Sequence, residues 1–249
     1  VLVAFLFSVP YLGVQLRASG DLFYVLTDGL VSANFGMFAL STVVVIYVAS
    51  GGLRSVAYVD CAQCILLALG IVILGGIAIH YSGGWTGLMN GLGNMVKQDI
   101  SSGNNLTPAG YSRSIAIPGS IQFVSAGSKA VGGAWTGMMC MTYMFALMGI
   151  QSSPAFSMWA FANKTSRAFR WQQVVASSLV IGIILFTFTI FQGVGGRVLL
   201  ENGIFSSVND KNLVPQLINL LSDSMPWLVG LLAVCALAAM QSTGAAYMS

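Results

Sequence analysis

Two adjacent hydroxyl residues near the end of the chain, Ser242 and Thr243, lie in a long apolar run that carries no charge after Asp223. The run from Pro226 to Ser249 is long enough to cross a bilayer, which takes ~20 apolar residues. Oxygen atoms are the ligands that a small hard cation requires. In membrane helices, however, Ser and Thr also bond the carbonyl three or four residues earlier, or join two helices. The pattern alone therefore leaves a cation site and ordinary helix bonding both open.

The residues just before this pair carry a resemblance to a known family. The segment 237–243 reads LAAMQST, and it resembles the LAA-x-M-S-T/S segment of the sodium:solute symporter family, which includes the proline, pantothenate and sodium/glucose cotransporters. In that family the two hydroxyls and the carbonyl three residues before the first hydroxyl bind sodium. The resemblance therefore implies Ala239, Ser242 and Thr243 as sodium ligands. It implies sodium as the coupling ion, with no cofactor and no other metal.

A second segment, 51–63, reads GGLRSVAYVDCAQ and resembles the family's GG-x-x-A-V-x-x-T-D-x-x-Q connection between two helices. We expect its acid, Asp60, to lie in the first turn of a membrane helix. A carboxylate there either complements the helix dipole or is an intramembrane functional group, and the sequence leaves both open. The resemblance implies the second role, with Asp60 on the inner sodium path.

A polar step interrupts the fourth apolar run. Residues 148–154 read MGIQSSP, and Gly, three polar residues and Pro predict a broken helix. Transporters place binding sites at such breaks because an unwound turn exposes backbone groups inside the membrane. The alternative is a proline kink whose exposed carbonyls are bonded by Ser side chains. The family has its broken helix at this position, so the resemblance implies Gln151, Ser152 and Ser153 as residues on the substrate side.

The composition indicates a multi-pass membrane protein. Only 7% of the residues are charged and 56% are hydrophobic, whereas soluble domains carry about 25% charged residues. The net charge of +3 gives no indication of a nucleic-acid partner. Four cysteines lie in apolar stretches and there is a single histidine, His80, so we expect no enzyme. Because the sequence begins with Val1, we expect an internal fragment, and the resemblance implies the fourth through ninth helices of the family.

The apolar runs predict an all-α integral membrane protein with one transmembrane domain over 1–249 and about six transmembrane segments. The resemblance implies that these form part of an inverted-repeat, leucine-transporter-like bundle. We expect an extramembrane loop at 81–132, beginning with a short surface helix, and another at 197–224, containing an amphipathic helix. Basic residues in the short turns indicate which side is cytoplasmic: Arg54, Lys164, Arg167 and Arg170. The expected membrane segments lie near 1–17, 30–52, 57–80, 134–162, 171–195 and 226–249.

The resemblance implies a function in the lipid bilayer of the cell membrane, namely sodium-coupled symport of a small organic solute. The alternative is a transporter-like sensory module of a membrane histidine kinase, because the same fold occurs fused to such kinases. A membrane enzyme would need clustered titratable residues, and Asp60 is the only acidic residue within the expected spans. The identity of the solute does not follow from the sequence.

Overall fold

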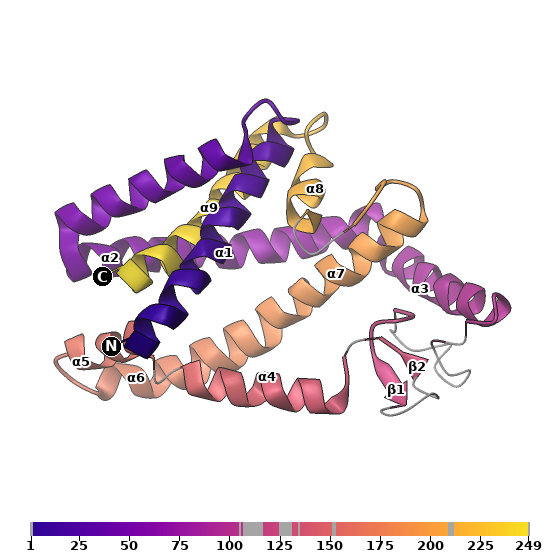
Figure 1. Cartoon of the computed structure of the whole chain (residues 1–249). Coiled ribbons are helices and arrows are strands. Elements are labelled where there is room, and N and C mark those ends of the chain that lie inside the picture. The colour runs from indigo at the N-terminus through magenta and orange to yellow at the C-terminus, as the bar shows by residue number, and fades with distance from the viewer. Residues whose placement is uncertain are drawn as a thin grey trace.

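The structure is a computed structural model that describes residues 2–104, 106, 117–124, 131–133, 135–150, 153–208 and 212–248. Within these residues nearly all regular structure is helical (Figure 1), which confirms the predicted all-α fold class. The exception is a short antiparallel pair, β1 (Gln122–Val124) and β2 (Val131–Gly132), in the long loop that we expected to be irregular. The inverted-repeat arrangement stays a prediction.

The first helix, α1 (Leu2–Leu26), is longer than the segment expected near 1–17. The polar residues that suggested a connection are accommodated within the helix. Arg17 Nε lies 3.2 Å from Asp21 Oδ1 one turn later, and such pairs support a helix. The chain turns only after Leu26, where Asp28 and Gly29 have positive φ of 50° and 82°.

Two expected spans, 30–52 and 57–80, correspond to the two halves of α2 (Ala33–Tyr81). Its backbone leaves helical geometry only at Gly52, with φ 59° and ψ −170°, a conformation that glycine adopts readily. Figure 1 shows the helix folding back at this point. Leu40 and Val44 from the first half pack with Val56 from the second. The two spans therefore form a hairpin joined by a single glycine rather than by a loop.

The fourth span is broken as the polar step predicted. It consists of α4 (Gly137–Ile150) and α5 (Pro154–Ala162), and Ser153 between them is extended, with ψ 150°. The cause is local, because a residue before proline disfavours helical geometry and proline suits the first helical turn. The fifth span is continuous through α6 (Arg167–Trp171), a π-helical stretch η3 (Gln172–Leu185) and α7 (Phe186–Glu201).

The expected loops contain more helix than their composition suggested. Helix α3 (Gly84–Ser101) packs on α7 through Leu88, Leu92 and Val198. Helix α7 runs past the expected end at 195 to Glu201, which pairs with Arg197 at 3.0 Å. Helix α8 (Leu213–Asn219) buries Leu217 and Ile218 completely in the main core. Both expected extramembrane stretches are therefore partly docked against the bundle.

The last helix, α9 (Pro226–Met248), lies against α1 and both halves of α2. Its neighbours approach closely where side chains are small. A Cβ added to Gly70 of α2 would lie 2.7 Å from the Cβ of Cys235. Among the described residues, three helical stretches are long and apolar enough to cross a membrane: Ala33–Tyr81, Phe169–Glu201 and Pro226–Met248.

Candidate functional site

Three oxygen atoms meet on one face of α9. The hydroxyl of Ser242 donates a hydrogen bond to the carbonyl of Ala239 at 3.1 Å, and the hydroxyl of Thr243 donates to the same carbonyl at 3.2 Å. These are the three residues that the resemblance implied as sodium ligands. The bonds are also the ordinary helical bonds of the alternative interpretation. The geometry brings the predicted ligands together without by itself choosing between the two.

The surroundings of this cluster are well packed. Ala245 of α9 is completely buried against Leu40 and Val44 of α2, while Ser242 and Thr243 are half-buried. A Cβ added to Gly244 would lie 3.7 Å from a methyl group of Val44, which is an ordinary contact distance. The helix that carries the oxygen cluster is therefore held close to its neighbour, and a methyl group at residue 244 fits without displacing it.

Asp60 lies deeper in its helix than the sequence predicted. The second half of α2 begins directly after Gly52, so Asp60 is more than two turns from its start rather than in the first turn. A helix dipole acts mainly within the first turn, and this position therefore weakens the dipole interpretation. One carboxylate oxygen, Oδ1, is buried without a hydrogen-bond partner. Unpartnered buried polar atoms are rare, and each needs an explanation.

Two further polar atoms near Asp60 are also buried without a hydrogen-bond partner: the Tyr47 hydroxyl and Gln63 Oε1. Gln63 lies one turn beyond Asp60 on α2. Tyr47 is in the first half of the hairpin, within electrostatic reach of the Asp60 carboxylate. The sequence analysis did not identify Tyr47. The sequence did contain a signal for Tyr47. It lies a short distance before Gly51–Gly52, and a hairpin at these glycines brings the residues before them close to those after them.

Of the three predicted substrate-side residues, only Ser153 can be located, because Gln151 and Ser152 lie outside the described residues. The Ser153 hydroxyl is buried and unpartnered at the start of α5. It lies near the hydroxyl of Tyr247, but no hydrogen bond joins the two, and the Tyr247 hydroxyl is unpartnered too. The ring of Tyr247 contacts Tyr11 of α1 at 5.0 Å between centroids. Neither tyrosine was singled out in the sequence, and no local pattern marks them.

A cavity of about 810 Å³ opens between α1, the second half of α2, α7 and α9. Its lining includes Ala239, whose carbonyl belongs to the oxygen cluster, but not Ser242 or Thr243. Gln192 of α7 also lines it and donates from Nε2 to the carbonyl of Ile71 at 2.9 Å. The volume lies in the range of small-molecule sites. The cavity therefore reaches one predicted ligand, and is large enough for a small organic molecule.

Long apolar helices, a broken span and a cavity inside the bundle define a multi-pass helical membrane protein. A family model described as the sodium:solute symporter family matches residues 1–248. The chain therefore belongs to the sodium:solute symporter family, which confirms the resemblance seen in the two sequence motifs. Members of this family are membrane transporters rather than enzymes.

Individual relatives align over shorter regions. The chain is 35% identical over 86 residues to sodium/glucose cotransporter 1 of Sus scrofa, an alignment that covers 34% of this chain and 13% of that protein. It is 32% identical over 107 residues to sodium/glucose cotransporter 1 of Ovis aries, covering 42% and 16% respectively. The alignments therefore span less than a fifth of the relatives' length. No solved structure gave a significant match.

Proposed function

We propose that the protein carrying this chain is a sodium-coupled symporter that moves a small organic solute across the cell membrane. The observation that carries the proposal is the convergence of three oxygens on α9, at 3.1 and 3.2 Å, in a chain of the sodium:solute symporter family. Ala239, Ser242 and Thr243 contribute ligands to sodium. Each ion that enters down a membrane potential releases roughly 2.3 kcal/mol per 100 mV, which is available to drive solute uptake.

Asp60 and Ser153 take separate roles in this proposal. Asp60 serves the inner sodium path, and its unpartnered oxygen supports that role because a passing cation would satisfy it. Ser153, with Gln151 and Ser152, contacts the solute at the broken span. The adjacent unpartnered hydroxyls of Ser153 and Tyr247 support a polar, hydrogen-bonding solute. The relatives are named sodium/glucose cotransporters, so glucose is the first solute to test.

The test uses the full-length protein reconstituted into sealed vesicles. Uptake of labelled glucose, and of a panel of other sugars, amino acids and carboxylates, is measured with an inward sodium gradient. We expect at least one solute to accumulate above its external concentration only with sodium, and not when potassium replaces it. Collapsing the gradient with a sodium ionophore should abolish accumulation. Uptake that is the same with and without a sodium gradient would refute the proposal.

A further inference from the structure

One face of α1 lines the central cavity. Pro10, Gly13, Arg17 and Asp21 follow one another at helical spacing, and all four border the cavity that also reaches Ala239. The last two residues border a second hollow of about 440 Å³ as well. That hollow is lined mainly by polar residues from the end of α1, the start of α2 and the start of α8: Tyr24, Ser32, Asn34 and Asn212. Arg17 and Asp21 therefore stand where the two hollows meet.

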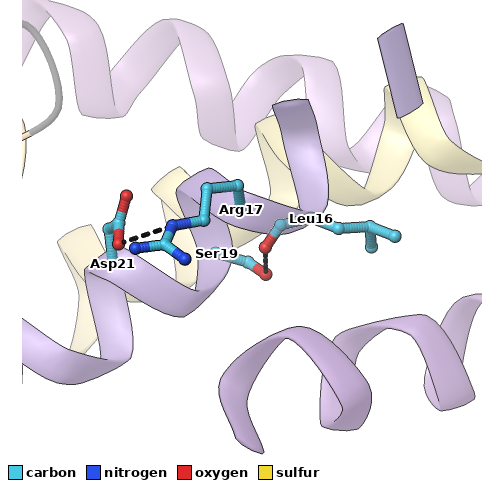
Figure 2. A network of polar contacts seen from close by, with 4 residues as sticks. All are labelled: Leu16, Arg17, Ser19 and Asp21. Carbon is cyan, nitrogen blue, oxygen red and sulfur yellow. Dashed lines mark hydrogen bonds and ion pairs between the residues drawn. The ribbon is translucent and has the colours of Figure 1, made fainter. Parts of the chain in front are cut away.

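These two residues carry all the charge of both hollows. Among the described lining residues, every other side chain is neutral. Figure 2 shows the Arg17 guanidinium turned toward Asp21, with Nε 3.2 Å from Oδ1. The arginine side chain is 56% exposed, whereas that of the aspartate is only 14% exposed. The carboxylate is thus the more enclosed charge of the pair.

The residues of α1 between Arg17 and Asp21 are closely packed. Ser19 is completely buried and its hydroxyl donates to the carbonyl of Leu16 at 2.6 Å (Figure 2). At Gly20, an added Cβ would lie 2.9 Å from the side chain of Met37, and it would also collide with the carbonyl of Ala33. This close packing of α1 on α2 disfavours a rotation of α1 that would turn Arg17 and Asp21 out of the hollows.

We propose that Arg17 and Asp21 form a charged constriction between an outer polar vestibule and the central cavity, and that Asp21 draws the coupling cation through it toward Ala239. The inference rests on the proposed function and adds an access route to it. A charge at a narrow opening with low-dielectric walls focuses the field and changes the local concentration of ions. Arg17 limits this attraction, so that the passage favours a cation without trapping it. If the pair only stabilised α1, neutralising either residue would not change how readily cations reach the cavity.

The test measures which charged reagents reach the cavity of the full-length protein in sealed vesicles. All cysteines of the full-length protein are first replaced, including the four of this chain. Cys235 is changed to Ala so that the Cβ next to Gly70 is kept. A reporter is then introduced as Gly13→Cys, where an added Cβ meets nothing within 4 Å. Membrane-impermeant cationic and anionic methanethiosulfonates of similar size are added from one side at a time. The ratio of their two reaction rates is the measurement.

We expect the reporter to react from the side of the α1–α2 turn. Asp21→Asn should lower the cation-to-anion ratio about threefold to tenfold, and Arg17→Gln should raise it by a similar factor. These factors are expected for one unit charge about 6 to 12 Å away along the helix in a partly hydrated opening. The double neutral variant should return close to the starting ratio. Arg17→Lys and Asp21→Glu should keep that ratio. A reference cysteine at Leu30, a residue that is 91% exposed, should respond far less.

Ratios that do not change with either neutral variant would overturn the inference, as would a reporter that cannot be labelled from that side. The labelling needs no transport, so it fails independently of the proposed function. Charge-dependent labelling without sodium-driven uptake would refute the proposed function alone. Sodium-driven uptake without charge-dependent labelling would refute this inference alone.

Discussion

Removing one hydroxyl from the oxygen cluster on α9 is the most direct test of the proposed sodium site. In Ser242→Ala and Thr243→Ala, one of the three oxygens that converge at 3.1 and 3.2 Å is lost. A cation inside the bundle cannot replace the missing ligand cheaply, because bare charges are costly to bury. Hydrogen bonds to charged groups contribute ~1.5–3 kcal/mol, and an ion–hydroxyl contact is taken to be similar. Each variant should therefore raise the sodium concentration for half-maximal uptake by about tenfold to a hundredfold.

The assay is solute uptake against sodium concentration in vesicles containing the full-length protein, with choline keeping the ionic strength constant. Two matched controls lie on the same turn. Thr243→Ser keeps the hydroxyl and should keep the sodium curve near wild type. Gly244→Ala adds a methyl group that fits at 3.7 Å from Val44, so it should also change little. If both alanine variants kept the wild-type sodium curve, Ser242 and Thr243 would be ordinary helix-bonding residues, and the sodium site would lie elsewhere.

Three further changes test the reasoning about Asp60 and the helix contacts. Asp60→Asn should leave the protein folded but raise the sodium requirement of uptake, and an unchanged sodium curve would remove Asp60 from the ion path. Gly70→Ala should destabilise the purified protein by about 1–3 kcal/mol because its Cβ would lie 2.7 Å from Cys235. Thermal unfolding measures this loss, and Cys235→Gly in the same protein should restore part of it. Gln192→Leu removes the 2.9 Å hydrogen bond to the Ile71 carbonyl and should lower the stability by about 0.6–2 kcal/mol in the same assay. An unchanged unfolding temperature would contradict a structural role for Gln192.

The features that follow from local physics could be predicted from the sequence. The break at Ser153 follows from the proline after it. The membrane helices follow from apolar runs whose length matches the bilayer thickness. Charged residues, in contrast, led to wrong predictions of where helices end. Arg17 and Arg197 suggested helix ends, but each pairs with an acid four residues later and the helix continues. A charge count does not distinguish a loop from a helix whose charges are paired on one face.

The candidate site could be predicted only where one short segment supplies all its members. Ser242, Thr243 and the Ala239 carbonyl lie within one helical turn and a little more, so their proximity was implicit in the spacing. Tyr47 and Tyr247 meet their neighbours through contacts between helices, which no single-segment pattern encodes. The depth of Asp60 was also missed, because the hairpin has no loop and its second arm begins earlier than the polar residues suggested.

The second arm of α2 contacts two other helices at glycines, so that one of the two residues at each contact contributes no side chain. Gly70 lies against Cys235 of α9, Gly75 lies against Phe188 of α7, and Gly195 of α7 lies against Ala78. Contacts of this kind resist sliding of one helix along the other, because a displaced helix would meet a larger side chain in place of the glycine hydrogen. The arm carrying Asp60 and the helix carrying the oxygen cluster are therefore closely packed against each other at Gly70. For the transport cycle that we propose, these close contacts favour alternating access by movement of other elements around them.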